Sequence, residues 1–248
     1  MTNMLFYKNL VALDRDLHQG LRLASLQDLG FAADATALPI VVGEFADIAR
    51  QQAIAFLPVD DGPPVPVALT GVPGGKNLYV GRKGQWTAPY LPAFVRRYPF
   101  VFARTGPDQL TLCIDLDCQQ LGRKSGDLLF DAQGEPTARV QQALALLSEF
   151  ERQHQQSQAF VQRLAEAGLL MQAQADARLD DGRQFSLQGL LVVDETRLRQ
   201  LPPDTLKAWA DSGDLGLVYA HLLSLGHLVE LLRRQPTAPA TLPTPTPA

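Results

Sequence analysis

Apolar and polar residues alternate over short segments of the first half of the chain, and this alternation predicts a strand-rich N-terminal half. Residues 53–59 and 65–72 are two predicted strands, joined by the turn-forming run Asp60-Asp61-Gly62-Pro63-Pro64. Residues 100–104 and 110–117 predict a second hairpin across Gly106-Pro107-Asp108. Shorter strands are expected at residues 21–24, 77–80 and 85–88, and short helices at residues 43–50 and 93–98.

Helical spacing dominates after Pro136. Val140, Leu144, Leu147 and Phe150 recur at i, i+4, i+7 and i+10, the pattern of one apolar helix face. Residues 149–158 are nearly all polar and indicate a break, after which Ser157 is expected to cap a second helix that ends at Gly168. A hairpin across residues 180–182 and helices at residues 201–209 and 215–233 complete the prediction.

These elements predict an α+β fold, with an antiparallel β-rich N-terminal half and a helical C-terminal region packed against it. We expect a single domain over residues 1–234, strand-rich over 1–135 and helix-rich over 136–234. Residues 235–248 form a proline- and threonine-rich tail that cannot bury a core, so we expect the tail to be disordered or polyproline-like.

Composition narrows the class of partner and the compartment. The net charge of −4, with acidic and basic residues interspersed along the 248 residues, disfavours nucleic acid binding. The only cysteines, Cys113 and Cys118, favour free thiols in a reducing cytoplasm. The first 16 residues lack the apolar core of a signal peptide, and we find no run of about 18 apolar residues that would span a membrane. We therefore expect a cytoplasmic protein with no membrane span.

Catalytic and cofactor motifs are absent from the sequence. It contains no GxSxG, HExxH, GxGxxG or paired CxxC motif, and its four histidines lack metal-ligand spacing. Residues 71–77 suggest a phosphate loop, but Thr70 stands where the first glycine is required and Asn77 replaces the Ser or Thr. We expect no metal and no cofactor.

The densest chemistry lies between residues 77 and 117, where Trp86, Tyr90, Arg96, Arg97 and Asp115 fall close together in sequence. Adjacent arginines on a helix point about 100° apart, so both cannot face the core. One should face solvent or a ligand, and the other should lie under the Trp86 and Tyr90 rings or reach Asp115 or Asp117. The pair is either a structural cation stacked on aromatic rings or a clamp for a carboxylate or phosphate.

Two histidines are further candidates for this site. His18 lies among polar residues, where a hydrogen-bonding role is the simpler interpretation. His221 shares a face with Leu217, Leu222 and Val229 in the last predicted helix and should therefore point inward, as a core histidine or as a ligand or proton-transfer group.

Several segments together resemble the bacterial SapC family. They are GKNLYVGRKGQWTAPYLPAFVRRYPFVFA, LCIDLD, GDLLFDAQGEP, VVDETRLRQLP and GLVYAHLLSL, in this order, and YLPAFVRRYPF is the most specific of them. The resemblance covers residues 21–234 and departs from the family pattern at residues 53–56 and in the tail. The positions carried over as signature residues are Glu44, Asn77, Trp86, Tyr90, Pro92, Arg96, Arg97, Pro99, Phe100, Asp115, Phe130, Gly134, His221 and Ser224.

The family is named for an association with paracrystalline surface layers, and the resemblance transfers no catalytic residues. A subunit of the layer itself fits this short chain without an export signal poorly, so we expect a non-catalytic intracellular accessory role in surface-protein or peptide handling. The Trp86-Tyr90-Arg96-Arg97 corner, Asp115, His18 and His221 are the candidate contacts for a peptide or protein partner. Two alternatives stay open: an enzyme that gathers His18 or His221 with Asp115, Cys113 or Arg97, and a structural component of the surface layer.

Overall fold

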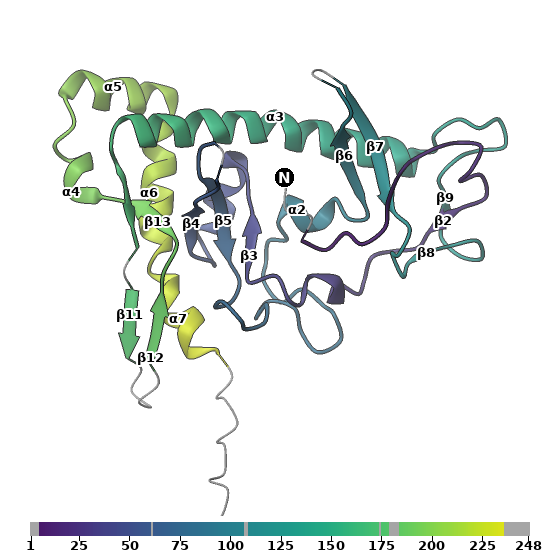
Figure 1. Ribbon diagram of the computed structural model, residues 1–248, viewed down its shortest axis with the longest axis horizontal. Coiled ribbons are helices and arrows are strands. Elements are labelled where there is room, and N and C mark those ends of the chain that lie inside the picture. The colour runs from purple at the N-terminus through teal and green to yellow at the C-terminus, as the bar shows by residue number, and fades with distance from the viewer. Residues whose placement is uncertain (1–4, 61, 107–108, 174, 179–183, 236–248) are drawn as a thin grey trace, which may run out of the picture.

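The computed structural model describes residues 5–60, 62–106, 109–173, 175–178 and 184–235 (Figure 1). Antiparallel strands dominate the N-terminal half, and helices cover the C-terminal part, as the hydrophobic pattern predicts. The strands are β1 (Leu10–Ala12), β2 (Arg22–Leu23), β3 (Ala37–Pro39), β4 (Ile54–Leu57), β5 (Val65–Leu69), β6 (Phe100–Arg104), β7 (Leu110–Asp115), β8 (Leu121–Gly122), β9 (Asp127–Leu128), β10 (Leu170–Gln172), β11 (Ala175–Arg178), β12 (Gln184–Leu187) and β13 (Leu191–Val193). The helices are α1 (Phe45–Ile48), α2 (Ala93–Arg96), α3 (Ala138–Glu166), α4 (Glu195–Leu198), α5 (Pro203–Ser212), α6 (Asp214–Ser224) and α7 (His227–Arg233), with short 3-10 turns η1 (Gly30–Ala32) and η2 (Val42–Glu44).

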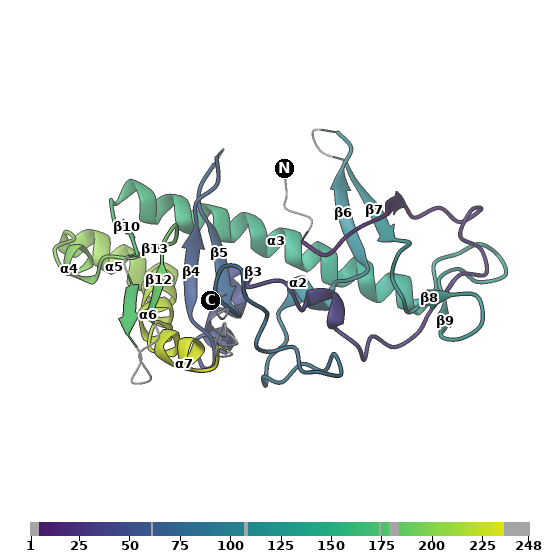
Figure 2. The ribbon, with the colours of Figure 1, turned by 60° about the horizontal axis from the view of Figure 1, so that its bottom comes forward.

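The largest sheet has the strand order β10-β13-β4-β5-β3. The predicted hairpin of β4 and β5 forms in antiparallel register, with Ile54 opposite Ala68 and Leu57 opposite Val65. Helix α6 lies against this sheet (Figures 1 and 2). The Ser224 hydroxyl accepts the Ile54 N–H at 2.9 Å, which fastens the helix to β4.

A second sheet has the order β1-β7-β6 and contains the other predicted hairpin, with Phe100 opposite Ile114. The sequence pattern did not predict β1, which pairs with β7 from about 100 residues away. Asp115, at the end of β7, is fully buried, and its carboxylate accepts the backbone N–H groups of Lys8 and Asn9 at 3.0 Å each. It therefore anchors the N-terminal segment to this sheet.

Helix α3 is one continuous helix of 29 residues, so the predicted break at residues 149–158 is wrong. That stretch is polar, but its Glu, Arg and Gln residues are strong helix formers and it contains neither Pro nor Gly. Ser157 is consequently an interior residue instead of a cap. The end is as expected, because Gly168 takes the left-handed conformation with φ +64°.

The two ends of α3 pack into two different hydrophobic cores. Val140, Leu147 and Phe150 join the core beneath the β1-β7-β6 sheet. Phe160 and Leu164 join the core between the large sheet and α6. In Figures 1 and 2, α3 runs along most of the molecule, with the β6–β7 hairpin toward one end and α6 toward the other.

Two further expectations need correction. The hairpin predicted over residues 77–88 is reduced to a turn with one isolated bridge, between Val80 and Trp86. The helix predicted over residues 215–233 is divided into α6 and α7 at residues 225–226. The predicted hairpin turn at residues 180–182 and the tail beyond residue 235 lie outside the described residues, and the single-domain assignment stays a prediction.

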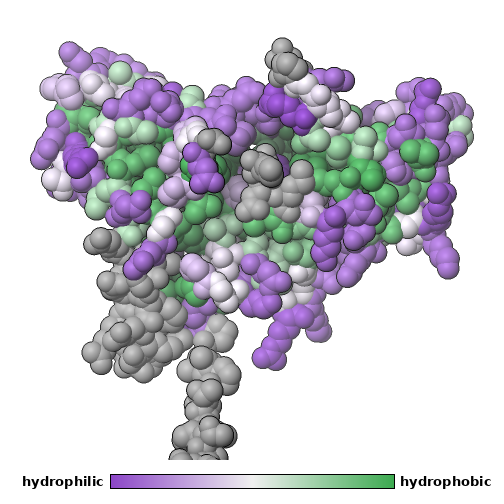
Figure 3. Space-filling model, in the orientation of Figure 1, coloured by the Kyte–Doolittle hydropathy of each residue, from purple (hydrophilic) through white to green (hydrophobic). Residues whose placement is uncertain are grey.

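The helical stretch of residues 214–233 is, by length and composition, apolar enough to cross a membrane, with a mean hydropathy of 1.5. This differs from the expectation, drawn from the sequence, that no stretch of the chain would suit a membrane span. Length and composition alone do not distinguish a membrane span from the core helix of a soluble protein, so this finding assigns no compartment. The surface of one face of the molecule carries both apolar and hydrophilic patches (Figure 3).

The contact of α3 with η2 allows a stability test. The Ser157 hydroxyl accepts the Val42 N–H at 2.9 Å and donates to the Gln153 carbonyl oxygen at 2.7 Å. Ser157→Ala removes the acceptor of this partly buried N–H and should lower the free energy of unfolding by about 1 to 2 kcal/mol. Ser148→Ala, at an exposed position of the same helix, is the matched control and should be neutral or slightly stabilising. Urea denaturation measures both variants, and equal midpoints would show that the Ser157 bond contributes nothing.

Candidate functional site

The two adjacent arginines of the Trp86-Tyr90-Arg96-Arg97 corner have opposite environments. Pro92 precedes the first turn of α2, and the helix ends at Arg96, with Arg97 as its C-cap. Arg97 is 8% exposed, whereas Arg96 lies on the surface. The expectation that only one of the pair can face the core is confirmed.

Arg97 lies in a cage of aromatic rings. Its guanidinium carbon is 4.1 Å from the centroid of the Phe94 ring and 4.8 Å from that of Phe150, with Tyr7 at 5.9 Å. Its Nε atom is buried without a hydrogen-bond partner, and no carboxylate pairs with Arg97 in the part of the chain that the structure describes. Burial lowers the pKa of Arg97. Cation–π contacts therefore take the place of a counter-ion.

This arrangement differs from the expected one in the rings that surround Arg97 and in the role of Asp115. The rings are Phe94, Phe150 and Tyr7, not Trp86 and Tyr90. The Asp115 carboxylate is occupied by the backbone N–H groups of Lys8, Asn9 and Asp117 and by the Tyr98 hydroxyl at 3.4 Å, so it does not pair with an arginine.

Arg96 is held in place but has no counter-ion. Its Nε donates to the Leu91 carbonyl oxygen at 3.0 Å, and its Nη2 donates to the Tyr90 hydroxyl at 3.1 Å. The guanidinium lies 5.6 Å from the centroid of the Tyr90 ring. Among the described residues, Nη1 has no hydrogen-bond partner and no carboxylate lies within ion-pair distance. Arg96 is thus an oriented cation with one free edge.

Behind Arg96 lies a buried carboxylate, Glu44, which is 3% exposed. Glu44 accepts three hydrogen bonds, from the Ala93 N–H at 2.7 Å, the Tyr90 hydroxyl at 2.9 Å and the Val41 N–H at 3.1 Å. Burial raises the pKa of Glu44, and the hydrogen bonds and the charge of Arg96 oppose that shift. Burial and the neighbouring Glu44 raise the pKa of Tyr90 to about 12.

Tyr90 therefore links the two charges, because it donates to Glu44 and accepts from Arg96. A hydroxyl can donate one hydrogen bond and accept another at the same time. The chain Arg96–Tyr90–Glu44 holds the loop before α1 against the start of α2, since Glu44 also receives the backbone N–H of Ala93.

A cavity of about 90 Å³ opens between this chain and α3. Its walls are made by η2 and the residue before it, by the α2 corner and by one side of α3. The lining residues are Val41, Gly43, Glu44, Tyr90, Ala93, Arg96, Leu146, Glu149, Phe150 and Gln153.

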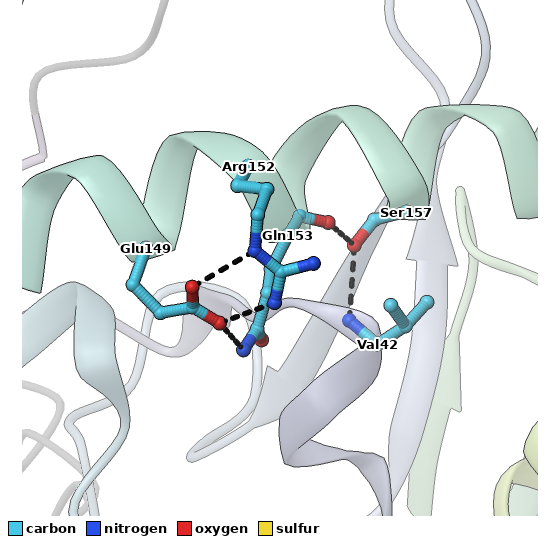
Figure 4. Close-up of polar contacts among 5 residues, drawn as sticks. All are labelled: Val42, Glu149, Arg152, Gln153 and Ser157. Carbon is cyan, nitrogen blue, oxygen red and sulfur yellow. Dashed lines mark hydrogen bonds and ion pairs between the residues drawn. The ribbon is translucent and has the colours of Figure 1, made fainter.

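The α3 wall of the cavity has its own polar network (Figure 4). Glu149 accepts hydrogen bonds from both Arg152 and Gln153, and the Arg152 contact is a salt bridge. These contacts lower the pKa of Glu149 to about 2. The charge of Glu149 is therefore already neutralised within α3.

Trp86 supports the corner without lining the cavity. Its Nε1 donates to the Tyr90 carbonyl oxygen at 2.7 Å, and its ring stacks on that of Tyr79 at 5.7 Å. It fixes the backbone of Tyr90 and connects the corner to the turn that precedes it.

His221, which was expected to point inward, is fully buried in α6. Its Nε2 accepts the Val193 N–H at 3.1 Å, so its Nδ1 must be the donor to the Ile54 carbonyl oxygen at 3.0 Å. Burial lowers the pKa of His221 to about 4. Val229, assigned from the sequence to the same face, is instead 48% exposed, because the helix divides before it.

His18 is 8% exposed, and its Nδ1 accepts the Asp14 N–H. No hydrogen bond or ion pair between described residues joins His18 or His221 to Asp115, Cys113 or Arg97. The constellation that an enzyme would need from these residues is thus not assembled in the described part of the chain. In the same part of the chain, no group of three His, Cys, Asp or Glu residues is placed to hold a metal ion.

Glu44 is not among the site residues predicted from the sequence, although it is a signature position of the resemblance. Glu44 is an isolated acid beside an apolar run, and Ala93, one of its donors, lies 49 residues away in the sequence. Leu146, Glu149, Phe150 and Gln153 were also missed as site residues, because they lie far from the corner in sequence and local patterns do not show contacts between distant segments.

The fold and the corner define an α+β protein with a surface arginine, a tyrosine and a buried carboxylate beside a small cavity. The SapC family profile matches residues 13–231, nearly the whole chain. The chain belongs to the SapC family. A search of curated proteins and a search of solved structures each found no match.

The environment of His221 predicts a loss of stability in acid. Because the folded-state pKa lies below the ordinary value of 6.5, the contribution of His221 to stability is complete above pH 6.5 and is lost as the pH falls toward 4. The loss should be on the order of 3 kcal/mol. Urea denaturation at a series of pH values should show this slope in the wild type and a weaker slope in His221→Gln. His227→Gln is the control for loss of a histidine from α7 and should keep the wild-type slope.

Glu44 predicts a slope of the opposite sign. Its folded-state pKa is raised, so the folded state binds a proton more tightly, and stability falls as the pH rises above the ordinary carboxyl value of 4.5. Glu44→Gln should remove this fall in stability.

Glu149→Gln is the matched control on the other wall of the cavity. Since the pKa of Glu149 is lowered, its contribution is present above pH 4.5, and salt should screen it because the group is exposed. Identical pH profiles for wild type and Glu44→Gln would contradict the prediction.

Proposed function

We propose that this SapC-family protein is a non-catalytic binding protein that recognises a carboxylate on a peptide or protein partner through Arg96. The observation that carries the proposal is the state of the Arg96 guanidinium, which is oriented by Leu91 and Tyr90, lies at the surface and lacks a counter-ion among the described residues. Arginine presents a planar fork that suits a carboxylate, and a fork already fixed in place loses little entropy on binding.

The charges around the cavity favour an anionic group over a cationic one. Glu149 is paired with Arg152, and Glu44 is held by three donors. Both carboxylates that line the cavity are therefore already satisfied, whereas Arg96 has an unused edge. Val41, Leu146 and Phe150 give the cavity an apolar wall, against which a side chain next to the carboxylate can pack.

The cellular role that we propose is an accessory one in surface-protein or peptide handling, in the cytoplasm. Cys113 and Cys118 are both free thiols, which suits a reducing compartment. The match to the SapC family supports the general assignment, and the link to surface proteins comes from the resemblance that names the family.

Peptide binding tests the proposal. A library in which each acidic peptide has an amide counterpart, with Asp and Glu replaced by Asn and Gln and the free C-terminus amidated, would be screened by fluorescence polarisation. Acidic members should bind the wild type better than their amide counterparts. Arg96→Ala should weaken this binding by about 10- to 100-fold, since a hydrogen bond to a charged group contributes about 1.5 to 3 kcal/mol.

Arg82→Ala, which removes another exposed arginine from the turn before Trp86, is the matched control and should bind as the wild type does. Circular dichroism would confirm that both variants are folded. Equal affinity of wild type and Arg96→Ala for every acidic peptide, or equal affinity for the acidic and amide members, would refute the proposal.

A further inference from the structure

A second cavity, of about 430 Å³, lies where α3 begins. Its walls are formed by β2, by β9 with the glycine before it, and by the start of α3. The sheet β8-β2-β9 lies at the end of the molecule away from α6 (Figure 1). No residue lines both this cavity and the cavity beside Arg96. The β2–α3 cavity, as we call it, is therefore a separate feature of the fold.

Two arginines from different elements line the β2–α3 cavity, Arg22 of β2 and Arg139 of the first turn of α3. Nη1 of Arg22 donates to the Gly126 carbonyl oxygen at 2.8 Å, which fixes this guanidinium against the cavity wall. The Nε atom of Arg139 is buried without a hydrogen-bond partner. Neither arginine forms an ion pair in the part of the chain that the structure describes. A buried donor without a partner costs free energy, so the cavity suits a ligand that accepts hydrogen bonds.

The start of α3 adds positive charge to the same cavity. Thr137 precedes the helix, but its hydroxyl donates to the Leu128 carbonyl oxygen, and no side chain caps α3. The first turn contains no acidic residue. Ala138 and Arg139, whose N–H groups have no acceptor within the helix, both line the cavity. The partial positive charge of this 29-residue helix therefore acts beside the two guanidinium groups.

We propose that the β2–α3 cavity binds the phosphate group of a phosphorylated polyol or sugar. Three sets of donors border it: Arg22, the Arg139 side chain and the first N–H groups of α3. A phosphate monoester has three terminal oxygen atoms and can accept from all three sets, whereas a single arginine fork already satisfies a carboxylate. The charged side chains of the cavity are the two arginines and Asp127, so their net charge is positive.

The size and the remaining polar groups of the cavity indicate what carries the phosphate. Pockets for small organic molecules have volumes of about 300 to 1,000 Å³, and this cavity falls within that range and exceeds what one phosphate ion fills. Asp127 and Gln142 are exposed side chains of the cavity wall, and among the described residues Asp127 forms no ion pair. A carboxylate and an amide are suited to hydroxyl groups, which both donate and accept. A hydroxyl-bearing phosphate ester therefore uses every polar side chain that the cavity leaves unpaired.

Isothermal titration calorimetry of the full chain with glucose 6-phosphate, glycerol 3-phosphate, inorganic phosphate and glucose tests the proposal. Both esters should bind the wild type more tightly than inorganic phosphate, and glucose should not bind. Arg22→Gln and Arg139→Gln should each weaken ester binding by about 10- to 100-fold. Arg82→Gln, which removes the same charge from an exposed turn outside the cavity, is the matched control and should bind as the wild type does.

Asp127→Asn is a second variant whose expected effect misfolding cannot imitate. Loss of the carboxylate should raise the affinity for inorganic phosphate and reduce the advantage of the esters over it. Arg96→Ala should bind the esters as the wild type does, because this site does not depend on the carboxylate site that we propose at Arg96. A wild type that binds no phosphate compound at millimolar concentration, or equal affinities of the wild type and both cavity variants, would overturn the proposal. Equal weakening by Arg82→Gln, or inorganic phosphate bound as tightly as the esters, would do so too.

Discussion

The position of α3 is the constraint on which the other parts of the structure depend. One end of this helix packs into the core beneath β6 and β7, and the other packs into the core beside α6. Between the two ends, Ser157 accepts the N–H of Val42 and so fixes the loop that leads to Glu44. Glu44 in this loop then accepts the backbone N–H of Ala93, which holds the start of α2 against the loop. The cavity exists because these elements meet beneath a straight, continuous helix.

The corner shows how one pair of neighbouring residues can serve two purposes. Arg97 stabilises the core through aromatic faces, at the cost of desolvating a cation. Arg96, one residue earlier, stays hydrated and is oriented by a tyrosine whose other partner is a buried carboxylate. Because Glu44, Tyr90 and Arg96 are joined by hydrogen bonds, a change in the charge of one of them alters the environment of the others.

The sequence predicts well those parts of the fold that depend on local signals. Proline, glycine and aspartate at the turns locate the β4–β5 and β6–β7 hairpins, and Gly168 locates the end of α3. Contacts between distant segments are not visible in such patterns, which is why β1, whose partner lies about 100 residues away, was missed.

The same distinction applies to the site. Local spacing showed that only one of Arg96 and Arg97 could be buried, but not which rings would enclose it. Glu44 became part of the site only through donors from a segment 49 residues away. The end of the first long helix was also predicted wrongly. Most of residues 149–158 are polar because they face solvent, but their residue types still favour a helix.

The aromatic cage of Arg97 has an electrostatic consequence for the surface beside it. Arg97 forms no ion pair among the described residues, although Glu151 of α3 is close enough to interact with it electrostatically. An interior of low polarity weakens the charge of Arg97 less than water would. Its field therefore reaches past the rings to the adjacent Arg96 and to His154 on α3. Burial is the main cause that lowers the pKa of His154, Glu151 opposes this shift, and Arg97 adds to it. If Arg96 binds a carboxylate as proposed, the anion is attracted by two cations although it touches only one. The buried charge of Arg97 would then increase the rate of encounter, and the exposed guanidinium of Arg96 would determine the geometry of binding.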